Sequence, residues 1–376
     1  MFSEGCQMNL IKRLKAKWRT VRNTQKAIKL KAACALYDHR DCSDVFCAED
    51  VKHIVIFRWD DKLGDCIMAG ILINNLRLHR PDIKITVICR QTTKLWLDKV
   101  SFIDKYILLG KHNLRKTLQP YKNKYDVFVD VSNGFSYKEI FIAKYINAKH
   151  YLGFSADRFN IIDVSIDSKQ THFYQRYINA TKILTNKECL TSEKPPVPNY
   201  KKELEFLDSV IIDKNYKNIV GINFFGSGKY RRFSLEKAVS LMKYWLEKHP
   251  EDLLVLLPTP GEEKFLTKLV NQLASSNLLL PTDKASLEMS LAIIDKADFT
   301  FTPDTAVVHM ASALDKPVIG IYRENRMNYE EWKPLGMHSQ TIFNREPICD
   351  NDSVYVYEFG YEQLEETRAN ILKAIK

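Results

Sequence analysis

Short apolar runs and helical stretches alternate along most of the chain, and this alternation predicts the fold. Apolar runs suited to strands buried in a parallel sheet occupy residues 53–57, 83–89, 125–131, 218–225, 253–257, 278–280, 299–302 and 318–322. Stretches with helical spacing occupy residues 66–80, 234–249, 262–273, 286–295, 305–314 and 361–375. Strands that alternate with helices predict an α/β protein with doubly wound parallel sheets.

A stretch with three prolines, residues 191–200, separates these strands into two sets. Its composition is typical of a linker, so we expect two α/β domains, at residues 51–195 and 196–357. A basic helical extension at residues 1–50 precedes them, and a C-terminal helix at 358–376 follows. Two such domains predict a cleft between two sets of strand ends.

The N-terminal arm carries most of the net charge. Residues 1–40 hold ten Lys or Arg residues against two acidic ones, which is +8 of the formal net charge of +10. Residues 9–37 predict a helix with a loose apolar stripe, made of Leu10, Leu14, Trp18, Val21, Ile28 and Leu36. Such a helix suits an anionic membrane surface, and the alternative is an arm that packs on a body beginning near Val51. Nucleic acid is not an expected partner, because the rest of the chain has little basic surplus.

The composition indicates a cytoplasmic protein. No apolar run approaches the ~20 residues that span a bilayer, and the N-terminus lacks the apolar segment of a secretory signal. The eight cysteines form no C-x-x-C pair, which favours reduced thiols. A zinc site at Cys34, Cys42 and Cys47 is an alternative, although this spacing matches no common zinc finger.

Residues 299–322 predict a strand, a helix and a second parallel strand. We expect Pro303 to stop the first strand and Asp304 to cap a helix that starts at Thr305. The helix N-terminus then lies at the carboxyl end of a parallel sheet, where its free N–H groups favour a phosphate. His309 follows one turn after Thr305 on the same face. The alternatives, a simple cap at Asp304 and a hydrogen-bonded core histidine at 309, stay open.

Two further loops carry candidate chemistry. Gly64 and Asp65 follow the first strand, where a carboxylate is placed for work as a general base. The loop at 224–232 combines two glycines with three cations, which is the equipment for a pyrophosphate, and its members are Gly226, Ser227, Gly228, Lys229, Arg231 and Arg232. It is not a Walker A loop, and no strand leads into G-x-G-x-x-G, which argues against a nicotinamide dehydrogenase. An ordinary turn with solvated lysines is the alternative.

Three motifs in this order resemble glycosyltransferase family 9, the bacterial lipopolysaccharide heptosyltransferases. Arg58–Asp65 is similar to the family's R-x-D-x-x-G-D, and Arg231–Ser234 to its basic middle motif. Asp304–Ala313 resembles D-T-G-x-x-H-x-A-A-A, and Trp332–Pro334 its trailing W-x-P. Two departures stand out, because Ala306 replaces the usual glycine and the middle motif lacks its Trp-Pro.

The resemblance implies a GT-B fold, with two Rossmann-like domains whose parallel sheets face a central cleft. It implies that residues 51–195 bind the acceptor and residues 196–357 the nucleotide sugar. It also implies inverting transfer of heptose from ADP-heptose to the lipopolysaccharide or lipooligosaccharide core, with no cofactor and no metal required. The protein would then be cytoplasmic and peripheral at the inner face of the bacterial inner membrane, with residues 1–40 on the anionic surface and a lipid-linked core oligosaccharide as acceptor.

The resemblance also assigns roles to residues. Asp65 is the expected general base. The expected donor-binding residues are Gly226, Ser227, Gly228, Lys229, Arg231, Arg232, Glu262, Glu263, Asp304, Thr305, Ala306 and His309, and the expected acceptor-binding residues are Arg58, Lys62, Gly64 and Arg90. The alternatives are a family 9 transferase with another nucleotide sugar or a protein acceptor, and an inactive module that binds a glycan.

Overall fold

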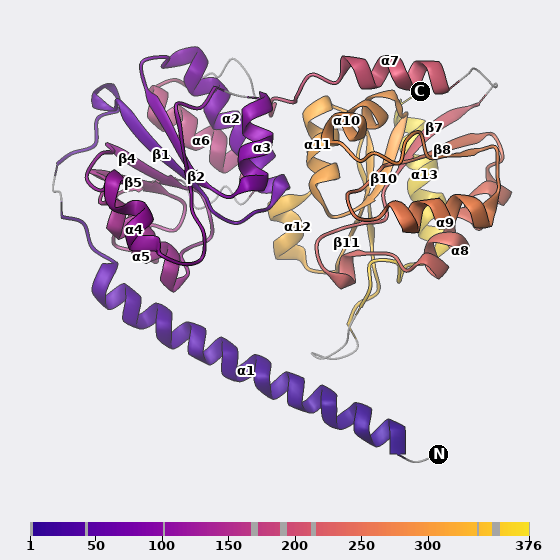
Figure 1. Ribbon diagram of the computed structural model, residues 1–376, viewed down its shortest axis with the longest axis horizontal. Coiled ribbons are helices and arrows are strands. Elements are labelled where there is room, and N and C mark those ends of the chain that lie inside the picture. Colours follow the sequence, from indigo (N-terminus) through magenta and orange to yellow (C-terminus); the bar gives the residue numbers. More distant parts are fainter. Residues whose placement is uncertain are drawn as a thin grey trace. The chain divides into compact units, whose positions relative to one another are not determined.

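The computed structural model describes residues 3–41, 44–100, 102–166, 172–188, 194–211, 216–336, 338–347 and 354–375 (Figure 1). The chain divides into two compact units whose main boundary lies between Glu193 and Lys194, and residues 63–67 are grouped with the second unit. Each unit is built on a six-stranded sheet, and every strand pair of the described residues is parallel. The predicted α/β architecture with parallel sheets is therefore confirmed.

The sheet of the first unit has the strand order β3-β2-β1-β4-β5-β6. Its strands are β1 (His53–Arg58), β2 (Lys84–Cys89), β3 (Lys105–Leu108), β4 (Val127–Asp130), β5 (His150–Gly153) and β6 (Val164–Ser165). Its helices are α1 (Ser3–Tyr37), α2 (Leu63–His79), α3 (Gln91–Val100), α4 (Leu114–Leu118), α5 (Tyr137–Ile146) and α6 (Phe173–Thr185), with short 3-10 turns at Ala48–Asp50 and Gln119–Tyr121. Helices α2 and α3 cover one face of the sheet and α4 and α5 the other (Figure 1).

The sheet of the second unit has the order β12-β11-β10-β7-β8-β9. Its strands are β7 (Asn218–Ile222), β8 (Asp252–Leu256), β9 (Leu278–Leu279), β10 (Phe299–Pro303), β11 (Val318–Tyr322) and β12 (Gln340–Phe343). Its helices are α7 (Lys201–Val210), α8 (Leu235–Lys248), α9 (Glu263–Leu273), α10 (Leu287–Lys296), α11 (Ala306–Leu314), α12 (Arg326–Trp332) and α13 (Tyr361–Ile375), with a 3-10 turn at Lys229–Arg231. Helices α8 and α9 pack with α13 on one face, in a single apolar core.

Helix α1 packs on α5 of the first unit near its C-terminal end (Figure 1). Ala33 belongs to the apolar core of that unit, and Leu30, Cys34 and Tyr37 pack against it. The expectation that the folded body begins near Val51 is therefore wrong, since part of α1 already belongs to it. No described helix is both long and apolar enough to cross a membrane.

The predicted strands and helices are present, with shifts at their ends that change two details of the candidate site. Helix α2 begins at Leu63 and not at Cys66, so Gly64 and Asp65 lie in its first turn. β10 ends at Pro303, as predicted, but Pro303 is itself part of the strand and pairs with Ile321, so the strand is one residue longer than expected. Within the predicted linker, residues 194–200 form neither helix nor strand, and 191–193 lie outside the described residues.

A buried carboxylate ties α13 to the second sheet. Asp252, at the start of β8, has no exposed surface. It accepts hydrogen bonds from Arg368 Nη2 at 2.8 Å, from Trp245 Nε1 at 3.0 Å and from Asn218 Nδ2 at 2.6 Å. The arginine compensates the buried charge, and the other two donors satisfy the remaining lone pairs, as a buried ion pair requires.

We expect Arg368→Met to lower the free energy of unfolding by about 3–5 kcal/mol, because Asp252 would keep a buried charge without its cation. Lys296→Met is the matched control, since Lys296 pairs with Asp208 at 2.6 Å on the surface. Such surface pairs contribute about 0–1 kcal/mol. Urea denaturation of both variants measures the free energies of unfolding. Equal losses in the two variants would show that the buried pair stabilises the fold no more than the surface pair does.

Candidate functional site

The strand order reverses once in the second sheet, between β7 and β10. From β7 the chain continues to β8 and β9 on one side, and from β10 it continues to β11 and β12 on the other side. The loops that follow β7 and β10 therefore lead away from each other at the carboxyl ends of these two strands. In open α/β sheets this reversal is the place where ligands bind. The loop after β7 holds residues 223–234, and the loop after β10 holds Asp304 and Thr305. Two of the three predicted motifs therefore meet at one edge of one sheet.

A buried asparagine fixes the β7 loop to the end of β10. Asn223 donates from Nδ2 to Thr302 Oγ1 at 2.9 Å and to the Phe225 carbonyl oxygen at 3.0 Å. The Phe225 N–H donates back to Asn223 Oδ1 at 3.1 Å. Because the side chain bonds both its own loop and the neighbouring strand, the two loops hold a fixed mutual position.

Gly226 allows the two loops to touch. A Cβ at this position would lie 2.8 Å from Arg231 Cβ and 2.9 Å from Thr305 Cγ2, closer than real Cβ atoms approach other atoms. Gly228 is needed for a different reason, because its φ of +90° lies in a region that side chains disfavour. That these glycines present N–H groups to a phosphate stays a prediction.

The three cations of this loop differ in how far they are neutralised. Arg231 Nη1 lies 3.2 Å from Asp304 Oδ2, and Arg232 forms an ion pair with Glu262. The Lys229 ammonium lies 4.9 Å from the centre of the Tyr230 ring, and among the described residues no carboxylate lies within ion-pair distance of it. Lys229 is thus the cation of this loop with charge left to offer an anion.

The N-cap of α11 is Thr305 and not Asp304, so the expected cap is wrong. Thr305 Oγ1 accepts a hydrogen bond from the Val307 N–H at 3.2 Å. Asp304 is drawn aside because its carboxylate pairs with Arg231, while its N–H donates to the Ile321 carbonyl oxygen at 3.0 Å. Ala306 is the first residue of the helix.

His309 lies inside the second unit. It is buried, and its ring meets the Trp332 ring edge on at 5.6 Å. A role for His309 at the sugar-phosphate end of a donor stays a prediction.

The β8–α9 loop contacts the cationic β7 loop through one of its two glutamates. Glu262 precedes α9 and reaches Arg232 in the β7 loop. Glu263 bonds its own loop, since its Oε1 accepts the Gly261 N–H at 2.9 Å, and hydrogen bonds from its own N–H and that of Gly261 lower its pKa. Glu262 is therefore tied to the cationic loop, whereas the placement of either glutamate near a ribose stays a prediction.

Arg323 is a cation that sequence reasoning missed. It follows β11 directly, and its guanidinium carbon lies 5.2 Å from the centre of the Tyr230 ring, the ring that Lys229 also approaches. Two cations thus meet one aromatic ring at this edge. A basic residue placed directly after a buried strand was the signal that could have found it.

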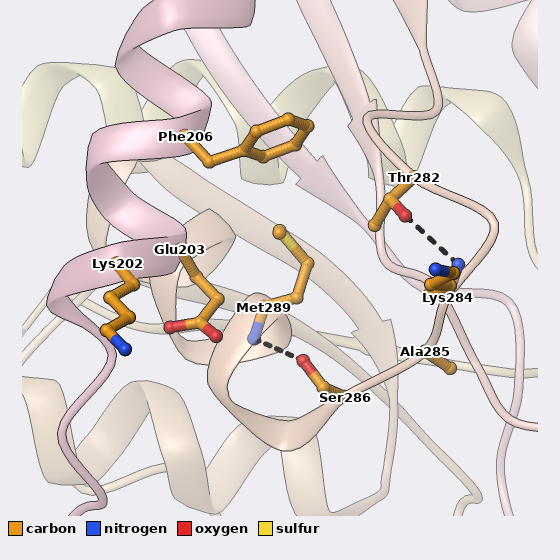
Figure 2. Close-up of a pocket in the computed structure, with 8 residues that line it drawn as sticks. All are labelled: Lys202, Glu203, Phe206, Thr282, Lys284, Ala285, Ser286 and Met289. Carbon is orange, nitrogen blue, oxygen red and sulfur yellow. Dashed lines mark hydrogen bonds between the residues drawn. The ribbon is translucent and has the colours of Figure 1, made fainter.

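A pocket of about 320 Å³ opens between the first turns of α7 and the loop before α10 (Figure 2). Its lining residues are Lys202, Glu203, Phe206, Thr282, Lys284, Ala285, Ser286 and Met289. Ser286 caps α10, accepting the Met289 N–H at 3.0 Å. None of the predicted site residues lines this pocket.

The first sheet also reverses once, between β1 and β4, and a buried ion pair lies at that point. Arg58 ends β1, Asp130 ends β4, and Arg58 Nη2 lies 3.8 Å from Asp130 Oδ1. Burial raises the pKa of Asp130 to about 6, although the guanidinium of Arg58 opposes the rise. Asp130 was missed in the sequence, where it reads as the last polar residue of a strand.

Arg58 and Arg90, both predicted to bind acceptor, lie at this same edge of the sheet. Arg90 follows β2, and its guanidinium carbon lies 5.4 Å from the centre of the Trp59 ring. Trp59 is held in turn by a 2.7 Å hydrogen bond from its Nε1 to the Leu109 carbonyl oxygen. Lys62 is exposed and immediately precedes α2.

Asp65 lies in the first turn of α2 and is 7% exposed. The partial positive charge of a helix N-terminus favours a carboxylate in that turn. Gly64 precedes it in the same turn. The structure thus gives Asp65 a defined position after β1, whereas its role as a base stays a prediction.

A fully buried arginine supports the loop that follows β4, and sequence reasoning missed it. The Arg176 guanidinium carbon lies 3.7 Å from the centre of the Phe154 ring and 4.2 Å from that of Phe173. Its Nη1 donates to the Val131 carbonyl oxygen at 3.2 Å and to Asn133 Oδ1 at 2.6 Å. Nothing in the sequence around Arg176 distinguishes it from a solvated residue of an amphipathic helix.

Among the described residues, no group of three or more His, Cys, Asp and Glu side chains could hold a metal ion. Cys34 and Cys47 are free thiols, and Cys42, the third member of the alternative zinc site, lies outside the described residues. Asp350-Asn351-Asp352, which has the D-x-D spacing of some glycosyltransferase metal sites, also lies outside them.

A family model and a curated relative both match this chain. The model described as Glycosyltransferase family 9 (heptosyltransferase) matches residues 112–356, more than half of the chain. That match begins after Arg58–Asp65, so the first motif lies outside it. A putative glycosyltransferase of Haemophilus influenzae is 21% identical in an alignment of 307 residues that covers 76% of this chain and 86% of that protein.

Solved structures of heptosyltransferases share the fold. The family 9 glycosyltransferase from Veillonella parvula has a TM-score of 0.63 at 17% identity, over 87% of this chain and 99% of that one. The E. coli ADP-heptose lipopolysaccharide heptosyltransferase II scores 0.61 at 16% identity, over 86% and 100%. The E. coli heptosyltransferase WaaC with ADP scores 0.55 at 15% identity, over 85% and 98%. These structures establish the GT-B fold, and with the family match they show that the chain belongs to glycosyltransferase family 9.

Proposed function

We propose that the protein is an inverting glycosyltransferase that moves heptose from ADP-heptose to the lipopolysaccharide or lipooligosaccharide core. The observation that carries the proposal is the convergence of the cationic loop and the N-terminus of α11 at the strand reversal of the second sheet, in a family 9 chain. Lys229 keeps charge for a diphosphate there, and Thr305 opens the helix. Solved relatives are described with ADP and with ADP-2-deoxy-2-fluoro heptose, which supports an ADP-sugar donor.

In the proposed reaction an acceptor hydroxyl oxygen attacks the anomeric carbon of the donor sugar. Asp65 accepts the proton of that hydroxyl as the new glycosidic bond forms. The bond between the anomeric carbon and the diphosphate breaks, and ADP leaves with the electron pair. Lys229 and the N–H groups at the start of α11 stabilise the negative charge that develops on the leaving diphosphate.

The proposed acceptor is the lipid-linked core oligosaccharide, presented at the inner face of the bacterial inner membrane. Lys62 and Arg90 would supply cations near the carboxyl ends of β1 and β2 to a phosphorylated or acidic core sugar, and Arg58, buried in its pair with Asp130, would support that site by fixing the end of β1. The protein would act there as a peripheral cytoplasmic enzyme.

One feature favours a second candidate, a family 9 transferase with another nucleotide sugar. Ala306 opens α11 where the family has glycine, and its methyl group narrows the space over a phosphate. A protein acceptor and an inactive glycan-binding module are further alternatives. Presenting purified protein with a panel of nucleotide sugars and measuring release of the nucleoside diphosphate separates these candidates.

We expect Asp65→Asn to lower turnover by about 10²–10⁴-fold with donor affinity nearly unchanged, because general-base catalysis contributes that much to rate and little to binding. Asp61→Asn is the matched control, since Asp61 is exposed in the same loop and its φ of 42° is one that asparagine tolerates. Steady-state kinetics give both quantities. An Asp65→Asn enzyme that keeps more than about a tenth of its turnover would remove Asp65 from the base role.

We expect Lys229→Ala to weaken binding of ADP by roughly ten- to hundredfold, because a charge-assisted hydrogen bond to phosphate contributes about 1.5–3 kcal/mol. Lys229 is preferred to Arg231 for this test, since removing Arg231 would also leave Asp304 without its partner. Lys248→Ala, at the far end of α8, is the matched control for charge. Calorimetry with ADP decides, and equal affinities in the two variants would place the diphosphate away from this loop.

Asp130 gives a pH test of the first unit. Its folded pKa of about 6 exceeds the unfolded value of about 3.9, so its contribution to stability is present below pH 4 and lost as the pH rises to 6. Between pH 4 and pH 6 the free energy of unfolding of the wild type should fall by about 2 kcal/mol relative to Asp130→Asn, out of a total of roughly 3 kcal/mol over a wider range. Urea denaturation across this range measures the difference, and parallel pH curves for the two proteins would contradict the buried, ionisable Asp130.

A further inference from the structure

Helix α1 has two different faces over residues 18–37. One face packs on the first unit through Leu30, Ala33, Cys34 and Tyr37. On this face the Tyr37 ring meets Phe141 of α5 edge on at 5.4 Å. The spacing of these residues, three or four apart, gives one continuous side of the helix.

The other face carries an apolar stripe that the described part of the chain leaves exposed. We define this stripe as Trp18, Val21, Ile28 and Leu36, whose exposed fractions are 72%, 49%, 61% and 63%. At 100° per residue the stripe points roughly 140° away from the face that packs on the body. The contacts of α1 with α5 therefore leave the stripe exposed.

Basic residues border the stripe on both sides. Arg22 and Lys29 lie along one border and Lys31 along the other, and all three are exposed. The whole of α1 contains a single acidic residue, Glu4, against nine Lys and Arg. In the sequence Leu14 and Leu10 continue the spacing of the stripe, and lysines and arginines continue beside them.

We propose that the apolar stripe of α1 docks on an anionic lipid surface. The stripe would enter the boundary between headgroups and acyl chains, and the bordering cations would meet the headgroup charges. A second copy of the chain is the poorer occupant, because pairing two stripes would bring Lys and Arg borders together. A nucleic acid backbone would meet the cations and leave Trp18 and its neighbours exposed to water.

The proposal rests on the proposed function, since a lipid-linked acceptor is what would bring the protein to a membrane. It narrows the expected membrane contact from residues 1–40 to one face of one helix. The opposite face is packed on α5, so docking would hold the first unit close to the lipid surface. Helix α1 precedes residues 112–356, so it is an addition to the part that the family model matches.

Point variants test the stripe better than truncation does. Removing residues 1–40 would also remove Asp38, whose Oδ1 accepts the Ile161 N–H at 2.9 Å, and Arg40, which pairs with Asp163. A truncated protein could then fail through misfolding. Val21→Ser with Ile28→Ser keeps every charge and every body contact, and Leu78→Ser with Leu95→Ser is the matched control on two other helices, at residues that are 53% and 52% exposed.

The experiment uses full-length protein with vesicles of equal parts phosphatidylglycerol and phosphatidylcholine, and with phosphatidylcholine vesicles alone. We expect flotation with the anionic vesicles at low salt, weakened by high salt. The stripe variant should bind about tenfold or more weakly, and the control variant like the wild type. Trp18 emission should shift to the blue on binding, because the other tryptophans are buried or half-buried, and Trp18→Phe should float without this shift.

Three results would overturn the proposal: no flotation of the wild type at low salt, equal flotation of stripe and control variants, or a dimer in sedimentation that the stripe variant abolishes. The last would assign the stripe to a second copy. Calorimetry with ADP on the same proteins separates this test from the proposed function. A stripe variant that no longer floats but binds ADP with unchanged affinity shows that the stripe acts independently of the donor site. A wild type that floats but does not bind ADP contradicts the proposed donor site and leaves the stripe proposal intact.

Discussion

The reversal of strand order in each sheet is the constraint on which the rest of this structure depends. Right-handed crossovers that leave a central strand pair in opposite directions place their helices on opposite faces, and the two loops at the reversal are left without a helix between them. In both units an arginine and an aspartate occupy this opening, Arg58 with Asp130 and Arg231 with Asp304. The same topology therefore gathers the same pair of charges twice.

The two pairs differ in exposure, and this difference separates their roles. The side chains of Arg58 and Asp130 are each 5% exposed, which suits a pair that holds strand ends together and shifts a pKa. The Arg231 side chain is 37% exposed, so a ligand anion can reach it without unfolding the loop. Gly226 and Asn223 keep the loop of this second pair in place, so its cations are positioned without the help of a ligand.

Carboxylates neutralise only part of the positive charge at the strand reversal of the second sheet. Arg231 and Arg232 each have a carboxylate, whereas Lys229 and Arg323 lie around the ring of Tyr230. A diphosphate can add to such a site without first separating an ion pair, which is the property that a site for a leaving diphosphate requires. Helix α1 also keeps cations available to a partner, since they border an apolar stripe that the described part of the chain leaves exposed.

Local sequence determined the elements and the order in which they follow one another. Apolar runs marked the buried strands, and Ser234 and Ser286 marked the starts of α8 and α10, because a serine hydroxyl satisfies the free N–H groups of a helix end without help from elsewhere. The glycines, the cations of the β7 loop and the carboxylate at position 65 were also visible as candidate chemistry.

Only the tertiary structure decided which partner each polar group takes. Asp304 reads as a helix cap until Arg231, far away in the sequence, draws its carboxylate aside and leaves the cap to Thr305. Asp130 and Arg176 show no local signal, because their burial and partners come from neighbouring strands and from aromatic rings on other elements. A residue's type and spacing are local properties, whereas its burial, its ion pair and its pKa depend on contacts that exist only after distant segments have packed together.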